Sequence, residues 1–343
     1  HDDPTMLRML EDLTGVSVLD IPLNDPATMA IFSSTDSLGV TPEQIGTSVG
    51  TLGVPEFGTR FVRQMLEDTL PKTFSDLVRI SGLSHGTNVW TNNAEDLIRR
   101  GITDISEVIS TRDDIMSYLM LKGVEARHAF RIMEQVRKGR GLTEDDVALM
   151  KQYDVPQWYI ESCQKISYMF PKAHAVAYVM MAFRIAYFKV HHPVAFYAAL
   201  FSLQAGDFDA QLICRGEQAV KAELERIISK GFDATPKERS MVTLLEIVIE
   251  AMVRGVRFLP VDLYKSAAQA FLIEDDALRP PFASLQGVGA SAAASIVQAR
   301  QDGEFISVED LRQRSGVTKA VIEAMRLHGC LEGLPETNQL TLF

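Results

Sequence analysis

The chain has 343 residues, 46% of them hydrophobic, and its 34 Lys and Arg against 45 Asp and Glu give a formal net charge of −11. This length and apolar content suffice for a large core divided over two or three domains, and the acidic balance excludes a uniformly basic nucleic-acid binder. The 3 cysteines lie far apart without metal-ligand spacing, which predicts reduced thiols, and no signal peptide or uninterrupted apolar span predicts export or membrane insertion.

The first residues, His1-Asp2-Asp3, are of types that bind metals or catalyse reactions. Asp3-Pro4-Thr5 is also an ordinary helix start with proline in the first turn, and we favour this interpretation. Residues 4–68 then predict short helices separated by turns. Helix starts are expected at Asp25-Pro26, Thr41-Pro42 and Pro55-Glu56.

A helix is predicted over 74–80, a polar loop over 82–90 and another helix over 93–100. The loop contains Ser84 and His85, a possible nucleophile and base. No third group is visible to orient them, so we do not favour hydrolase chemistry. Thr111 to Asp114 form a capping-box start for the next helix.

Residues 121–140 carry six Lys and Arg against two Glu, a local charge of +4. Arg127, Arg131 and Lys138 share one helical face, while Ala126, Ala129, Met133 and Val136 face the core. A solvated basic face is one interpretation. The other is a clamp on a triphosphate, because the planar guanidinium matches phosphate oxygens.

A long apolar helix follows Pro171 and carries Lys172, His174 and Tyr178 in its first two turns. It is either a core helix with polar caps or a nucleotide site. In the second interpretation Lys172 and His174 bind phosphates and Tyr178 lies against a base or sugar. At its far end, the adjacent His191 and His192 point to different faces, so a metal hydrolase built on them is not favoured.

The C-terminal part begins after a predicted domain boundary at 204–209. Long amphipathic helices are expected over 210–230 and 236–254, and alternating runs at 257–263 and 270–278 predict a small hairpin or β-addition.

Gly287 and Gly289 permit a tight hairpin whose amides point outward at a helix N-terminus, with Val288 and Ser291 beside them. Helices over 305–314 and 318–328 complete the pattern of a tandem helix-hairpin-helix unit, which holds duplex backbone without reading sequence. The second hairpin, Ser315 to Lys319, is less typical of such units. After them, the tail residues Gln339, Leu340, Leu342 and Phe343 either fold back or anchor a partner's pocket.

Several segments have amino-acid sequences that are specific enough to indicate a protein family. Phe170-Pro-Lys-Ala-His-Ala-Val-Ala-Tyr-Val179 and Ala182-Phe-Arg-Ile-Ala-Tyr-Phe-Lys-Val-His-His-Pro193 closely resemble the fingers segment of C-family replicative DNA polymerases, of the PolC-type DNA polymerase III α subunit. The resemblance takes in 1–6, 82–87, 126–133 and 338–343, and so spans the chain. It implies a C-terminal fragment of such a polymerase.

The resemblance implies a mainly α fold with a fingers region over 1–205. A duplex-binding region over 206–334 would carry a small β element and a tandem helix-hairpin-helix unit at about 280–332. A clamp-binding tail would occupy 335–343. The two Mg²⁺ ions and the palm aspartates that hold them are expected outside this chain, upstream of His1.

The resemblance also assigns roles. The implied nucleotide-binding residues are Ser84, His85, Arg127, Arg131, Lys172, His174 and Tyr178. The implied DNA-binding residues are Gly287, Val288, Gly289 and Ser291. The implied sliding-clamp residues are Gln339, Leu340, Leu342 and Phe343, because Gln-Leu-x-Leu-Phe resembles the clamp-binding peptide of bacterial polymerases.

The expected function is the nucleotide- and duplex-binding part of a cytoplasmic DNA-directed DNA polymerase that adds deoxynucleotides to a primer 3′ end. Its expected partners are primer–template DNA, deoxynucleoside triphosphates, the sliding clamp and other replisome subunits. The alternative is a non-catalytic DNA-binding scaffold that recruits a partner through its C-terminal peptide. Nucleotide binding separates the two.

Overall fold

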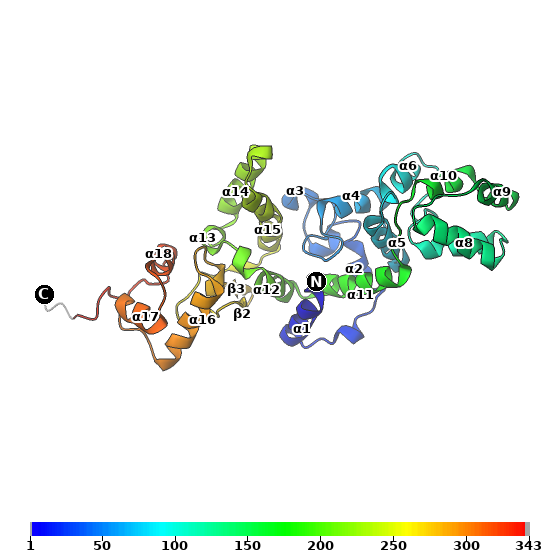
Figure 1. Cartoon of the computed structure of the whole chain (residues 1–343). Helices are drawn as coiled ribbons and strands as arrows, with labels where there is room; N and C mark the ends of the chain where they lie inside the picture. The colour runs from blue at the N-terminus through cyan, green and yellow to red at the C-terminus, as the bar shows by residue number, and fades with distance from the viewer. Residues whose placement is uncertain (1, 340–343) are drawn as a thin grey trace. The chain divides into compact units, whose positions relative to one another are not determined.

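A computed structural model of the chain describes residues 2–339, which are mainly helical with one small sheet, as predicted (Figure 1). The chain divides into two compact units. Unit 1 comprises His1–Val18, Gly39–Gly46 and Phe188–Phe343, and unit 2 comprises Leu19–Leu38 and Thr47–Tyr187.

Unit 2 is built from short helices connected by turns. They are α2 (Pro26–Ala30), α4 (Arg60–Thr69), α5 (Phe74–His85), α6 (Glu95–Arg99), α7 (Arg112–Leu121), α8 (Ala126–Arg137), α9 (Glu144–Gln152), α10 (Gln157–Lys165) and most of α11 (Lys172–His191). The smaller elements are η1 (Val18–Asp20), η2 (Asp36–Leu38) and η3 (Trp90–Ala94).

Most predicted helix starts are confirmed by their caps. The Asp25 side chain accepts a hydrogen bond from the Thr28 amide at 3.1 Å, and Thr41 forms a full capping box with Gln44. The predicted start at Pro55-Glu56 is wrong. Glu56 has a left-handed φ of 71°, which a helix cannot continue, and the chain turns there until Thr59 caps α4.

The predicted polar loop over 82–90 is wrong in its first half, because α5 continues to His85. Gly82 lies inside this helix, where a Cβ would collide with the Ser110 side chain. It is therefore a close-packing glycine and not a turn glycine. The following helix begins later than predicted, since residues 91–93 have non-helical dihedral angles and α6 starts only at Glu95.

One face of α11 lies in the core of unit 2, which confirms the core-helix interpretation for that face. Ala175, Val179, Ala182 and Phe183 are buried there. The Phe183 ring stacks on Phe32, with ring centroids 6.1 Å apart. The N-terminal turn of the helix is exposed, and Lys172 and His174 lie on it.

Unit 1 begins with α1 (Asp3–Thr14), which has Pro4 in its first turn, so the helix-start interpretation of this segment is confirmed. His1 lies outside the described residues. The other helices before the sheet are α3 (Pro42–Ile45), α12 (Pro193–Leu203), α13 (Ala210–Ile213), α14 (Glu217–Lys230) and α15 (Pro236–Val253), with η4 (Ala205–Asp207) and η5 (Gly231–Asp233) between them. The single helix predicted over 210–230 is wrong, because Gly216 adopts a φ of 101° and separates α13 from α14.

The predicted β element is confirmed as a three-stranded sheet in the order β1-β3-β2. β2 (Leu272–Glu274) and β3 (Ala277–Arg279) form an antiparallel hairpin, and β1 (Arg257–Phe258) pairs in parallel with β3. Phe201 from α12 contacts Phe258 and Phe271, with ring centroids 5.8 and 5.7 Å apart, so aromatic packing joins α12 to the sheet.

The last part of unit 1 holds η6 (Phe282–Ser284), α16 (Ala290–Ala299), η7 (Arg300–Asp302), α17 (Val308–Ser315) and α18 (Lys319–His328). These elements have the spacing of the predicted tandem helix-hairpin-helix unit. Its first helix is shortened to the single turn η6.

Candidate nucleotide and duplex DNA sites

Four aromatic or imidazole rings gather at the N-terminal end of α11 in unit 2. His85, the last residue of α5, stacks on Phe170 with ring centroids 4.7 Å apart and on Tyr178 at 6.0 Å. Phe170 also lies 6.1 Å from Tyr178 and 5.9 Å from His174. Three of the residues predicted to bind nucleotide are thus brought together around Phe170, and we call these four residues the ring cluster.

His85 is paired with the carboxylate of Glu56. That hydrogen bond raises the pKa of His85, against the opposing effect of partial burial. The Glu56 backbone is held in the left-handed region, which aims its side chain at the imidazole at a conformational cost. At lower pH the imidazolium of His85 is neutralised by Glu56, so the ring cluster presents flat ring surfaces fixed by this ion pair.

The remaining predicted residues near α11 have local partners. The Ser84 hydroxyl donates to the Ser81 carbonyl at 3.0 Å, within its own helix. The backbone amide of Lys172 donates to the Asp113 carboxylate at 3.0 Å, so a side chain from α7 caps α11. The Lys172 side chain lines a pocket of ≈ 210 Å³ together with Arg79 and Asp114.

The two predicted arginines on α8 differ in whether an ion pair neutralises their charge. Arg131 Nη2 donates to Asp146 Oδ1 at 2.8 Å, and the Asp146 side chain is 2% exposed. Arg127 is exposed, and within residues 2–339 it has neither an ion pair nor a hydrogen bond from its side chain. The predicted core face is correct for Ala129, Met133 and Val136, but Ala126 is exposed because it is the first residue of the helix.

No hydrogen bond, ion pair or ring contact within the described part of the chain joins Arg127 or Arg131 to the ring cluster. Sequence reasoning missed Phe170 and Glu56. Phe170 was the first residue of the segment that resembles the polymerase fingers but was given no role, and Glu56 lies in a segment predicted to be helical. Both residues contact His85, which lies 29 positions from Glu56 and far from Phe170 in the sequence.

The first hairpin of the helix-hairpin-helix unit has the predicted backbone. Gly287 has a φ of 91°, and Gly289 is the N-cap of α16. Val288 is buried and its amide donates to the Leu285 carbonyl at 3.1 Å, so it anchors the turn from inside. Gly289 and Ser291 are exposed on the outside of the hairpin, as a backbone-phosphate site requires.

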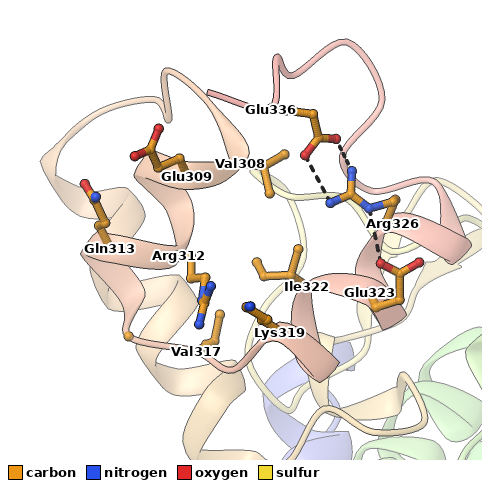
Figure 2. Close-up of a pocket in the computed structure, with 11 residues that line it drawn as sticks. Val308, Glu309, Arg312, Gln313, Val317, Lys319, Ile322, Glu323, Arg326 and Glu336 are labelled. Atoms are coloured by element: carbon orange, nitrogen blue, oxygen red, sulfur yellow. Dashed lines mark hydrogen bonds and ion pairs between the residues drawn. The ribbon is translucent and has the colours of Figure 1, made fainter. Parts of the chain in front are cut away.

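The second hairpin joins α17 to α18 through Gly316, which has a φ of 73°, and the buried Val317. A pocket of ≈ 690 Å³ lies beside it. Arg312 from α17 and Lys319 from the first turn of α18 line this pocket, and Figure 2 shows both side chains directed toward the hairpin side of it. Two cations thus lie near the N-terminus of α18, where an anion is favoured. The same pocket is lined by Glu309, Glu323 and Glu336, and the last two are paired with Arg326.

Residues 335–338 lie against the start of α17. The amides of Val308 and Glu309 donate to the carbonyls of Pro335 and Glu336 at 2.9 and 3.1 Å, so the tail satisfies two donors that the helix leaves free. Glu336 is paired with Arg326 of α18 (Figure 2). Gln339 ends the described chain, and the predicted clamp residues Leu340, Leu342 and Phe343 lie outside it.

Comparison with known proteins agrees with this geometry. Residues 3–152 match the bacterial DNA polymerase III alpha subunit finger domain, and residues 255–340 match a helix-hairpin-helix motif. The whole chain is 60% identical to the PolC-type DNA polymerase III of Clostridium perfringens and 57% identical to those of Bacillus subtilis and Caldanaerobacter subterraneus. This chain is homologous over its whole length to a segment of PolC-type DNA polymerase III.

The homologous segment covers 24% of the length of each of these PolC-type relatives. The finger-domain match contains Ser84, His85, Arg127 and Arg131, while the ring cluster extends beyond it through Phe170, His174 and Tyr178. Both hairpins fall within the helix-hairpin-helix match. The predicted relation to PolC-type polymerases and the predicted helix-hairpin-helix unit are both confirmed.

Within residues 2–339, no three His, Cys, Asp or Glu side chains form a group able to hold a metal ion. The cysteines Cys163, Cys214 and Cys330 are all free thiols. Of the helices described, none is long and apolar enough to cross a membrane.

Proposed function

We propose that this chain is the nucleotide- and duplex-binding portion of a bacterial replicative DNA-directed DNA polymerase, which adds deoxynucleotides to a primer 3′ end. The observation that carries the proposal is the homology to PolC-type polymerases over all 343 residues, at 57–60% identity. The reaction needs two metal ions, for which we propose Mg²⁺ held by carboxylates in another part of the polymerase. This chain would position the substrates.

For the incoming deoxynucleoside triphosphate we propose Arg127, Arg131, Lys172, His174, Tyr178, Ser84 and His85 as the binding residues. Arg127 is the first of them, because its guanidinium is exposed and uncompensated within the described chain. The ring cluster supports stacking of a base or sugar on Tyr178, with His85 fixed beside it by its pair with Glu56. Arg131 would contribute less positive charge to this site, because it also neutralises Asp146.

For duplex DNA we propose that Gly287, Gly289 and Ser291 of the first hairpin bind backbone phosphates, while Val288 holds the turn from inside. Arg312 and Lys319 support the same role for the second hairpin. We further propose that Gln339, Leu340, Leu342 and Phe343 bind the sliding clamp, and that the polymerase works in the cytoplasm with other replisome subunits. Tethering at the clamp would raise the effective concentration of enzyme at the primer.

Two measurements on the purified chain test the proposal. Fluorescence anisotropy with two duplexes of unrelated sequence should give equal, strongly salt-dependent affinities, because phosphate contacts carry no base information. A primer-extension assay with Mg²⁺ should give no templated incorporation by the chain alone.

Absence of duplex binding, or incorporation by the isolated chain, would overturn the proposal. Nucleotide binding distinguishes the proposed function from the scaffold alternative. In a full-length PolC-type polymerase carrying this segment, Arg127→Ala should impair the nucleotide step, whereas a scaffold would leave that step unchanged.

A further inference from the structure

We propose that the duplex-backbone site extends beyond the first hairpin to Lys237, in the first turn of α15, which supplies a further phosphate contact. The inference rests on the proposed function, since it assumes that the first hairpin meets duplex DNA. It concerns a residue 50 positions upstream of Gly287 that no part of the helix-hairpin-helix pattern includes.

The starting observation is the way Gln286, the residue before Gly287, is held. Its amide N donates to Gln211 Oε1 at 3.0 Å, and Gln211 Nε2 donates back to its carbonyl at 3.3 Å. Its side-chain Nε2 donates to the Phe208 carbonyl at 2.8 Å. Lys237 Nζ donates to its Oε1 at 3.1 Å. All four polar groups of Gln286 are therefore bonded to residues 208–237.

These bonds have two consequences. They fix the start of the hairpin against α13 and α15, so the amides of the turn are pre-organised before DNA arrives. They also hold the Lys237 ammonium against the side chain of the residue next to Gly287. A full positive charge is thus bonded to the side chain of the residue that precedes the hairpin, whose amide donors carry only partial charges.

Within the described residues, the charge on Lys237 has no carboxylate partner, in contrast to the three cations of the neighbouring helix α14. Lys221 Nζ lies 2.8 Å from Glu217 Oε1, and Arg226 and Lys230 both lie 2.9 Å from Glu238 Oε2. The partner of Lys237 is a neutral amide, and the residue is exposed. An exposed ammonium that is positioned but not neutralised favours an anion, and on this surface the proposed anion is a backbone phosphate.

The test uses the purified chain and fluorescence anisotropy with a duplex, over a series of salt concentrations. Lys237→Gln removes the charge, Lys237→Arg keeps it, and Lys221→Gln is the matched control with the same change in net charge on an ion-paired lysine. Thermal unfolding of each variant verifies that it is folded.

We expect Lys237→Gln to bind duplex about two- to fivefold more weakly, the range of one exposed charge pair. The slope of log affinity against log salt should be smaller in magnitude by about 0.9, because one fewer backbone phosphate is neutralised by the protein. Lys237→Arg should restore both, and Lys221→Gln should match the unsubstituted chain.

Equal affinity and slope for Lys237→Gln and Lys221→Gln would overturn the inference, and Lys237 would then serve only to hold Gln286. If Lys237→Gln and Lys221→Gln bind duplex equally but Gly289→Val abolishes binding, the proposed function stands and only the extension to Lys237 fails. If the unsubstituted chain binds no duplex, both fail.

Discussion

Lys189 Nζ lies 2.7 Å from Glu250 Oε1, and neither side chain is exposed to solvent. The pair joins the end of α11 to α15 inside unit 1. Glu250 Oε1 also accepts a hydrogen bond from the Tyr197 hydroxyl at 2.6 Å, and Arg254 Nη1 donates to that hydroxyl at 3.2 Å. Burial raises the pKa of Tyr197, so it stays a neutral donor. The two buried charges neutralise each other, although Glu250 Oε2 is buried without a hydrogen-bond partner in the described structure.

Lys189→Met should therefore destabilise the chain strongly. Removing one partner leaves the Glu250 carboxylate buried without its counter-charge, at a cost of roughly 3–5 kcal/mol. Urea denaturation would measure the change in free energy of unfolding. The control is Lys221→Met, which breaks an exposed pair and should cost under about 1 kcal/mol. Similar losses for the two variants would contradict the prediction.

The His85–Glu56 pair predicts a pH-dependent stability. The pKa of His85 is raised in the folded chain, so the pair stabilises fully below the unfolded value of about 6.5 and is lost as pH rises through the raised value. Glu56→Gln should therefore lower stability at pH 6 by at most about 1 kcal/mol, since His85 is partly exposed, and should have little effect at pH 9.

Urea denaturation at pH 6 and pH 9 measures this difference. Glu95→Gln is the control, because its partner Arg99, 3.4 Å away, does not titrate in this range. Its effect should be equal at the two pH values. An equal effect of Glu56→Gln at both would exclude His85 as the titrating partner.

Arg127→Ala and Arg131→Ala should separate nucleotide binding from stability. Arg127 is exposed and uncompensated in the described chain, so its removal should leave folding intact and cost the nucleotide step roughly 1.5–3 kcal/mol, one charge-assisted contact. Arg131 neutralises the buried Asp146 carboxylate, so its removal should also lower the free energy of unfolding.

Single-turnover incorporation over a nucleotide titration, in a full-length PolC-type polymerase carrying this segment, measures the first effect. Denaturation of the chain measures the second. An unchanged nucleotide affinity and rate for Arg127→Ala would assign that residue to a solvated basic face.

Gly289→Val should impair duplex binding equally for unrelated sequences without destabilising the fold. Gly289 has a φ of −77°, which any residue can adopt, and nothing lies within 4 Å of a Cβ added there. The new side chain would meet only the incoming phosphate. Gly287→Val is the contrasting variant, because the φ of 91° there strains a branched side chain and should lower stability as well. Loss of binding for one sequence alone would make the hairpin a base reader.

Removal of residues 339–343 should abolish clamp-dependent long synthesis while leaving short-primer extension by the full polymerase nearly intact. The truncation leaves residues 335–338 in place, and these cap α17, so the helix-hairpin-helix unit should keep its stability. Removal of 335–343 would also uncap α17 and deprive Arg326 of its partner Glu336, and should lower stability. Processivity assays with and without clamp decide the matter, and equal product lengths for tailed and tailless enzyme would contradict it.

Local signals were sufficient for much of the fold. Capping residues such as Asp25 and Thr41, and proline in the first turn of α1, determined where helices begin, because these effects act within a few residues. The glycine spacing at Gly287 and Gly289 likewise determined the first hairpin, since only the backbone conformation of those positions is involved. The long segments whose amino-acid sequence resembles PolC-type polymerases were sufficient to predict the homology.

The tertiary structure decided which charges are available for binding. Arg127 and Arg131 are equivalent on the helical face that the sequence predicts, yet only Arg131 meets Asp146, which comes from the next helix. Glu56 reaches His85 across 29 positions and Lys237 reaches Gln286 across 49. Periodicity and caps are local, whereas the neutralisation of a charge depends on which distant side chain packs beside it, and that is known only once the chain is folded.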